Sequence, residues 1–467
     1  MVRSDTKPEE PSFWNATIWP FLGRYLSNRF GNDGYTLSAE SSKDILSVRG
    51  TVQRQILINT LSASNTIVEL PGGYSAVLVQ TNTLPKGIET VRGLRVMSPG
   101  AVLARIAPSS FNDDPVSLEV MLKTTPWEDV FREFVSGPSD ETKMGRAVGA
   151  YRAVGFSTQA DQLAEALRKV GNIVREKNPF GHHEPQRVLK LERSPYAARL
   201  DSMCARMRDE VAKIFANRTV VPITTEQYLK QLDETYPRDS YNSLSIEGYQ
   251  VTEGLIRRVA QGQWNPSSEP DARNALAARG YFEAFQKVRL SILDIRNGQD
   301  SVDVLARDFK SWHVALFQPA VDAGIITHAD LAGYRNGLVV INTSRHCPPP
   351  KEALMDTMDR MFDILRKEKS PEVRAVLGHF AFVYIHPFIA GNGRVARFLM
   401  NAMLASGGYP WKTIEVKDRQ LYFAALEDAS VNGDIRAFAK FVRATIDGTI
   451  DRLKLDRSAK ETQRLTH

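Results

Sequence analysis

The sequence predicts an α+β N-terminal domain followed by a mainly α-helical domain. Short runs of β-branched and aliphatic residues, separated by turn residues, occupy the early part of the chain. From Ser98-Pro99 onward the apolar residues recur at helical spacing. A length of 467 residues is too great for one ordinary core and favours two domains, which we expect at 1–180 and 190–460.

The clearest β element is a hairpin in the N-terminal domain. Thr66 to Leu70 and Ser75 to Gln80 are rich in strand-forming residues, and Pro71-Gly72-Gly73 separates them. Helices follow it, because apolar residues repeat three or four positions apart at Trp127, Val130, Phe131 and Phe134, and again at Ala160, Leu163, Ala164 and Leu167. This domain is therefore expected to be α+β.

A segment between Arg175 and Glu192 loses this periodicity and gathers proline, glycine and charge, which predicts a linker. It contains His182-His183. Adjacent histidines on a polar linker are more often solvated than bound to metal, so a metal site here is the weaker interpretation.

The rest of the chain is predicted to be almost entirely helical. The expected helices are Tyr196–Phe215, Thr225–Leu232, Asp271–Ile295, Val302–Phe317, Lys351–Arg366, Glu372–Tyr384, Val395–Ala405 and Asp434–Leu455. One β-hairpin is expected near Leu338 to Thr343, where a Val-Val-Ile run follows Tyr-Arg-Asn-Gly.

Composition excludes several classes of protein. Hydrophobic content of 42% and charged content of 24% are ordinary for globular chains, and no apolar run is long enough to cross a membrane. With Cys204 and Cys347 as the two cysteines, a disulfide framework is excluded, and a cytoplasmic location is expected. The net charge of +6 is too small to indicate nucleic-acid binding by itself.

The segment from Phe382 to Asn401 predicts a cradle for a polyphosphate. Glycines at 391 and 393, around Asn392, let successive backbone N–H groups point into one concavity. The helix that begins near Arg394 aims its N-terminus at the same place. Arg394 and Arg397 lie three residues apart, so they share a helix face and can both bind phosphate oxygens.

His386 lies directly before this cradle. An imidazole beside bound phosphates is suited to take a proton from a hydroxyl as that hydroxyl attacks phosphorus. The predicted reaction is transfer of a phosphorus-containing group to an alcohol.

A different interpretation of the same glycines remains open. Gly391 to Ala396 also fits the dinucleotide-binding pattern G-x-G-x-x-[G/A], with a strand-like Phe382 to Ile385 before it and Glu415 after it. The pattern needs a parallel sheet, and Arg419 to Leu455 offers only helix. This alternative is therefore the weaker one.

At these residues the sequence resembles the Fic family, whose signature is H-P-F-x-[D/E]-G-N-G-R-x-x-R. The matching positions are His386, Pro387, Phe388, Gly391, Asn392, Gly393, Arg394 and Arg397. The resemblance implies a helical Fic fold with a β-hairpin flap at about Leu338 to Ser344, and transfer of AMP from ATP to a Ser, Thr or Tyr hydroxyl of a protein. It also implies that His386 is the base, that the loop binds phosphates and that Arg397 contacts the γ-phosphate.

One position departs from the signature. Ala390 stands where the family carries the Asp or Glu that binds Mg²⁺, and a methyl group cannot coordinate a hard cation. AMP transfer is therefore expected to be impaired. The alternatives are a nucleotide-sensing pseudoenzyme or antitoxin-like regulator, and a transferase of another phosphate-containing group.

Upstream, Ser243-x-x-x-Glu247-Gly248 resembles the inhibitory motif that precedes some Fic domains, and an inhibitory helix is expected around 240–255. A carboxylate paired with Arg397 would occupy the place of a γ-phosphate. In some relatives this glutamate supports removal of AMP, so de-AMPylation stays open. Self-modification, a homodimer and a bacterial source are further expectations.

Residues 20–170 show a fainter resemblance to AbiEi-type antitoxin or regulator proteins. It rests on Arg24 to Asn28, Ser38 to Glu40 and the helix start at Met97 to Pro99. This resemblance implies a regulatory or binding module, with DNA as one possible partner.

Overall fold

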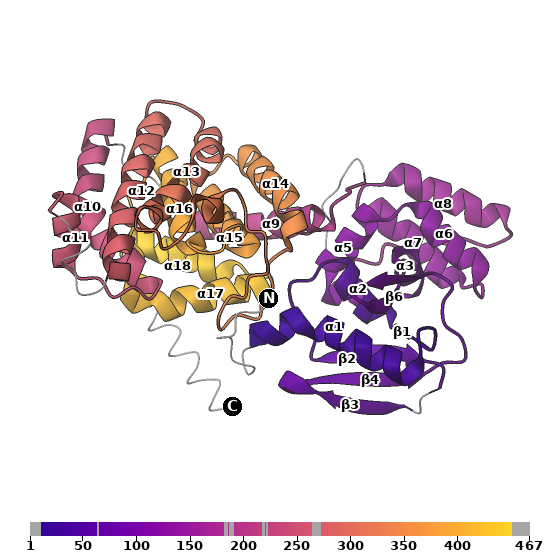
Figure 1. Cartoon of the computed structure of the whole chain (residues 1–467). Helices are drawn as coiled ribbons and strands as arrows, with labels where there is room; N and C mark the ends of the chain where they lie inside the picture. Colours follow the sequence, from indigo (N-terminus) through magenta and orange to yellow (C-terminus); the bar gives the residue numbers. More distant parts are fainter. Residues whose placement is uncertain are drawn as a thin grey trace, which may run out of the picture. The chain divides into compact units, whose positions relative to one another are not determined.

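The computed structural model describes residues 11–62, 65–181, 185, 191–216, 220, 223–263 and 272–450 (Figure 1). The chain forms two compact units. One is Met1–Ala205 together with Val340–Pro349, and the other is Arg206–Val339 together with Pro350–His467. The division falls within helix α9 (Pro195–Phe215) instead of the segment 175–192, where we expected a linker. His182-His183 lies outside the described residues.

The N-terminal unit contains a four-stranded sheet in the order β1-β2-β4-β3. Its strands are β1 (Tyr35–Leu37), β2 (Gln55–Thr60), β3 (Thr66–Leu70) and β4 (Tyr74–Gln80). β3 and β4 form the predicted antiparallel hairpin, in which Leu70 pairs with Tyr74. β2 and β4 are parallel, while β5 (Ile88–Val91) and β6 (Leu94–Met97) form a separate antiparallel pair.

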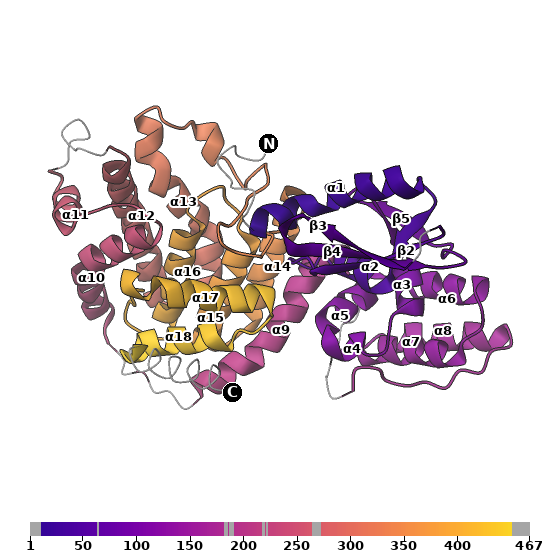
Figure 2. The same ribbon diagram turned by 90° about the horizontal axis from the view of Figure 1, so that it is seen from below.

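Helices complete this unit around two hydrophobic cores. In one, α1 (Pro11–Phe30) packs on the four-stranded sheet through residues such as Leu22 and Leu26 (Figure 2). The other lies among α3 and the helices after it and includes Val130 and Leu163. Val130 and Leu163 belong to the apolar helix faces that were predicted from the sequence. The helices are α2 (Ala39–Leu46), α3 (Pro99–Arg105), α4 (Ser110–Asp113), α5 (Pro115–Thr124), α6 (Trp127–Ser136), α7 (Glu141–Ala153) and α8 (Ser157–Lys169).

The second unit is mainly helical, as predicted. Its central helix is α16 (Asn392–Ser406), which packs against α12, α13 and α15 (Figure 1). The other helices are α10 (Thr225–Ile246), α11 (Glu253–Ala260), α12 (Ala272–Arg296), α13 (Ser301–Asp322), α14 (Leu354–Lys367), α15 (Pro371–Ile385), α17 (Arg419–Val431) and α18 (Arg436–Asp447). Short 3₁₀ turns among the described residues of this unit include η3 (His328–Leu331), η4 (Lys351–Ala353) and η5 (Val416–Asp418).

The predicted β-hairpin flap at 338–344 is wrong in its secondary structure. Residues 335–350, all of them described, contain no strand. They include a turn in which the Ser344 N–H donates to the Ile341 carbonyl at 3.1 Å. The later part of the segment packs in the N-terminal unit, where the Cys347 N–H donates to the Gly50 carbonyl at 2.7 Å. The Ser344 and Cys347 N–H groups therefore form hydrogen bonds other than those of a β-hairpin.

Two further expectations need correction. The helix expected around 240–255 ends at Ile246, and Glu247 is its C-cap; α11 begins only at Glu253. The strand-like Phe382 to Ile385 is the last turn of α15, so the arrangement required by a dinucleotide-binding pattern is missing there. Within the described part of the chain, no helix combines the length and apolar character needed to span a bilayer.

Candidate active site

His386 ends α15 in a backbone conformation that few non-glycine residues adopt. Its φ of 52° and ψ of 58° are left-handed, which turns the chain sharply into Pro387. Arg335 holds this corner: its Nε donates to the His386 carbonyl at 2.8 Å and its backbone N–H donates to the Pro387 carbonyl at 2.9 Å. The surrounding structure thus fixes a strained turn, a feature common at functional sites.

The hydrogen bonds of His386 define which ring nitrogen can act. Nδ1 lies 3.3 Å from the Val383 carbonyl oxygen, which can only accept, so Nδ1 carries the proton. Burial and the nearby Arg335 charge together lower the pKa of His386 to about 4, against the opposing effects of the Val383 carbonyl and the Glu247 carboxylate. The imidazole is therefore neutral at pH 7 and offers Nε2 as a proton acceptor.

The loop after His386 is closed by one buried side chain. Asn392 Oδ1 accepts from the Phe388 N–H at 3.0 Å, and Asn392 Nδ2 donates to the Phe388 carbonyl at 2.8 Å. Gly391, with a φ of 83°, precedes α16, and a Cβ at this position would lie 2.9 Å from the Phe317 ring. Glycine is thus required here by conformation and by space, and the N-terminal N–H groups of α16 open onto the loop.

Arg394 and Arg397 are both buried beside this loop, at 2% and 4% exposure. Arg394 Nε and Nη1 and Arg397 Nη1 have no hydrogen-bond partner among the described residues. The Arg394 guanidinium lies over the rings of Tyr249, at 5.2 Å, and Phe317, at 5.0 Å. Buried guanidinium N–H groups without acceptors are costly, so the site is suited to an anionic ligand.

Arg397 is held by the end of α10. Its Nε donates to Ser243 Oγ at 2.9 Å, and its Nη2 donates to the Ser243 carbonyl at 3.0 Å and to Glu247 Oε1 at 2.9 Å. Burial raises the pKa of Glu247, but the Arg397 and Arg394 guanidiniums outweigh it and hold that pKa below its ordinary value. Glu247 is therefore an ionised partner of Arg397 at neutral pH.

The Glu247 carboxylate also occupies the loop itself. A Cβ on Gly393 would lie 2.3 Å from Glu247 Oε1 and 3.2 Å from Arg397 Nη1. The carboxylate therefore rests directly on the backbone of the second loop glycine, in the concavity where the sequence predicted phosphate oxygens.

Comparison with known proteins gives this arrangement a family. Residues 303–404 match the model of the Fic/DOC family, a range that includes His386, the glycine loop and both arginines. This part of the chain is a Fic domain. The resemblance drawn from the signature residues is thus confirmed, whereas Glu247 lies outside the matched range.

Curated proteins that are similar to this chain include protein adenylyltransferases. The protein adenylyltransferase Fic of Nematostella vectensis is 31% identical over 265 residues, covering 55% of this chain and 57% of the relative. The protein adenylyltransferase fic-1 of Caenorhabditis elegans is 27% identical over 230 residues, covering 48% and 42%. The chain thus spans about half the length of the curated relatives it matches.

Solved structures with similarity to the chain include C. elegans Fic-1 (aa134–508), at 20% identity and a TM-score of 0.40, covering 74% of this chain and 93% of that one. Another is a Fic domain containing signaling protein from Bacteroides thetaiotaomicron, at 17% identity and a TM-score of 0.40, covering 54% and 95%.

The Fic domain of this chain does not provide a side-chain ligand for Mg²⁺ at the expected position. Ala390 has no oxygen in its side chain, and its carbonyl accepts from His313 Nε2 at 3.1 Å. Within the described ranges, no three or more His, Cys, Asp or Glu residues lie together in a way that could hold a metal ion. The residues present do not fit this cation.

Several residues that shape the Fic site were not predicted from the sequence. His313 stacks on Phe388 at 3.7 Å with an interplanar angle of 9°, and Phe317 braces the loop. His313 is buried at 5% exposure. His379 is fully buried, and its Nε2 forms a hydrogen bond with the Tyr422 hydroxyl at 2.8 Å.

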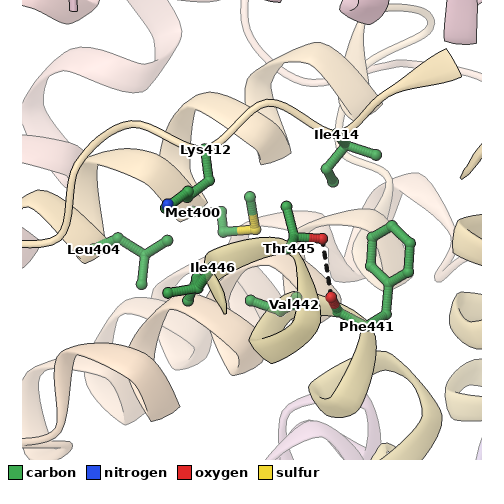
Figure 3. Close-up of a pocket in the computed structure, with 8 residues that line it drawn as sticks. All are labelled: Met400, Leu404, Lys412, Ile414, Phe441, Val442, Thr445 and Ile446. Atoms are coloured by element: carbon green, nitrogen blue, oxygen red, sulfur yellow. Dashed lines mark hydrogen bonds between the residues drawn. The ribbon is translucent and has the colours of Figure 1, made fainter. Parts of the chain in front are cut away.

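A small apolar pocket is lined in part by residues from the C-terminal half of α16, whereas the glycine loop precedes the N-terminus of that helix. Figure 3 shows Met400 and Leu404 of α16 facing Phe441 and Ile446 of α18. None of the predicted site residues lines it, so we assign it to the packing of α16 against α18.

Proposed function

We propose that this protein is a Fic-type protein adenylyltransferase, which transfers AMP from ATP to a hydroxyl group of a protein. The observation that carries the proposal is the neutral His386, with Nε2 as acceptor, at the start of a loop beside two buried arginines. The names of the curated relatives support the same activity.

In the proposed reaction, His386 Nε2 takes the proton of a Ser, Thr or Tyr hydroxyl. The freed oxygen forms a bond to the α-phosphorus of ATP while the bond from that phosphorus to pyrophosphate breaks. The N–H groups of the loop, with Arg394 and Arg397, would hold the phosphates and offset their charge. No step is assigned to a metal ion, because Ala390 supplies no ligand for one.

We also propose that Glu247 inhibits this reaction. Its carboxylate pairs with Arg397 at 2.9 Å and rests on Gly393, so a terminal phosphate would meet both steric overlap and charge repulsion. ATP would then bind without the Arg397 contact. De-AMPylation supported by the same glutamate is a further activity that this position allows.

A second candidate function follows from Ala390. A site that grips nucleotide phosphates but lacks the metal-binding carboxylate could sense nucleotide without transferring AMP, as a regulator would. Transfer of a different phosphate-containing group is the remaining enzymatic alternative. The N-terminal unit could then bind the partner, for which DNA and the AbiEi-type resemblance of residues 20–170 stay predictions.

Labelled ATP with Mg²⁺ distinguishes these functions. Wild type, Glu247→Gly, Ala390→Asp and the double variant are compared for labelling of the protein itself and of added proteins. Adenylyl transfer predicts strong labelling in the double variant, which His386→Ala abolishes. Ala390→Asn is the matched control, because it has the size of Asp without the charge. A double variant that binds ATP but stays unlabelled would favour the sensor.

A further inference from the structure

Arg394 is a buried cation that lies over two aromatic rings. Its exposure is 2%, and two of its three guanidinium nitrogens, Nε and Nη1, donate to nothing in the described chain. The guanidinium carbon lies 5.2 Å from the Tyr249 ring centre and 5.0 Å from that of Phe317. A ring under the face of a guanidinium leaves its in-plane N–H groups available to other acceptors.

Tyr249 reaches Arg394 from the same turn that carries Glu247. The Tyr249 N–H donates to the Leu244 carbonyl at 3.1 Å, and Gly248 takes the left-handed φ of 87° that closes the end of α10. Arg273 lies over the same Tyr249 ring at 5.5 Å. The backbone of the turn is thus fixed, and the tyrosine ring lies near the guanidinium groups of two arginines.

We infer that Tyr249 is a positioning residue of the nucleotide site, which holds Arg394 so that its N–H edge faces the phosphates of a nucleoside di- or triphosphate. The inference rests on the proposed nucleotide binding. It divides one segment into two opposite roles, since Glu247 blocks Arg397 whereas Tyr249 supports Arg394. The inhibitory turn is then a permanent part of the site.

These two roles have a structural consequence for how the proposed inhibition by Glu247 is released. If the whole turn withdrew, Arg394 would lose the Tyr249 ring along with the Glu247 carboxylate. Rotation of the Glu247 side chain alone would free Arg397 and keep Arg394 in place. The site is therefore best completed by a local movement at one side chain.

The test measures binding of ATP, ADP and adenosine by calorimetry in the Glu247→Gly background, where the cradle is open. Tyr249→Leu removes the ring, Tyr249→Phe keeps it, and Tyr249→Met is a second ring-free variant. Phe282→Leu is the matched control, because Phe282 lies under Arg279 at 5.7 Å in the same unit. Thermal melting checks that each variant is folded.

We expect Tyr249→Leu and Tyr249→Met to weaken ATP and ADP alike by roughly tenfold, a typical effect of a desolvated ring–cation contact. The affinity of the two ring-free variants for adenosine should stay within about twofold of the background. The affinities of Tyr249→Phe and Phe282→Leu for ATP and ADP should also stay within about twofold of it. Unchanged ATP and ADP affinity in both ring-free variants would overturn the inference. Tighter binding would also overturn it, because Tyr249 would then oppose nucleotide binding as Glu247 is proposed to do. If the Glu247→Gly background itself binds no nucleotide, the proposed function fails instead.

Discussion

Replacing Glu247 tests whether the contact with Arg397 opposes ATP binding. Two substitutions separate charge from volume. Glu247→Gln keeps the shape and one hydrogen-bond acceptor but loses the charge, whereas Glu247→Gly removes the side chain. Both variants leave Arg397 with its two hydrogen bonds to Ser243, at 2.9 and 3.0 Å, so the arginine stays in place.

The size of the effect can be worked out from the geometry. The Arg397 side chain is 5% exposed, the Glu247 side chain is 26% exposed, and their nearest atoms are 2.9 Å apart. Unit charges about 4 Å apart attract by about 4 kcal/mol at an effective dielectric constant near 20. A displaced Glu247 regains hydration, which offsets part of this, so a net penalty of about 2 kcal/mol on ATP is expected. That equals about thirtyfold in affinity.

Calorimetry in a His386→Ala background measures this without turnover of ATP. ATP affinity should rise about thirtyfold in Glu247→Gly and about tenfold in Glu247→Gln. ADP lacks the terminal phosphate, so its affinity should change by less than about threefold. Equal gains for ATP and ADP would show that the carboxylate does not occupy the place of the terminal phosphate. No gain in either variant would refute the inhibitory role.

Three further predictions concern the loop, the strained corner and pH. Asn392→Ala leaves the N–H and carbonyl of Phe388 unpaired in the interior, so chemical denaturation should show a loss of about 2–4 kcal/mol in the free energy of unfolding; a loss under about 1 kcal/mol would contradict it. Arg335→Lys keeps the charge and the backbone bond to Pro387, but its side chain cannot donate to the His386 and Gly337 carbonyls together, so self-labelling by the activated double variant should fall at least about tenfold with the melting temperature nearly unchanged. Equal labelling would show that this arginine does not position His386. Burial lowers the pKa of His386 to about 4 and that of His379 to about 3, from about 6.5 in the unfolded chain. Between those values the unfolded chain binds more protons, so the free energy of unfolding should fall as pH drops below about 6.5, by up to about 1.4 kcal/mol per pH unit for each histidine. His379→Phe should make denaturation midpoints less dependent on pH, and an unchanged slope would contradict this.

Many helices were predicted well because their signal is local, although α10 runs to Ile246 and not only to Leu232 as expected. Apolar spacing located α9, α12 and α16 to within a few residues, since one buried face repeats along the same segment. The Val-Val-Ile run near 339–341 misled us because an apolar run becomes a strand only if another strand pairs with it. Here Val340–Pro349 packs in the N-terminal unit, which a local pattern cannot reveal.

Site residues that are close together in the sequence could likewise be predicted, whereas those that come from distant segments could not. The loop from His386 to Arg397 could be predicted because its glycines, amide and arginines lie within one turn and one helix start. Arg335 could not be predicted, since it is 51 positions before His386 and lies in a segment that reads as an ordinary turn. Tyr249 and Phe317 also escaped prediction, because aromatic residues near helix ends usually indicate packing.

Gly393 contacts both the Glu247 carboxylate, which we propose to be inhibitory, and the proposed phosphate site. A side chain at 393 would collide with Glu247 Oε1, at 2.3 Å from the Cβ position, and would approach Arg397 Nη1 to 3.2 Å. The absence of a side chain therefore gives a carboxylate oxygen access to the loop backbone and to the guanidinium at once. A phosphate oxygen needs the same access, since both anions seek N–H donors. Any substitution at 393 that excluded the Glu247 carboxylate would also exclude the phosphate, whereas the carboxylate can be removed without closing the cradle. For this reason we expect the proposed inhibition to be relieved by substitutions at Glu247 and not by substitutions in the loop.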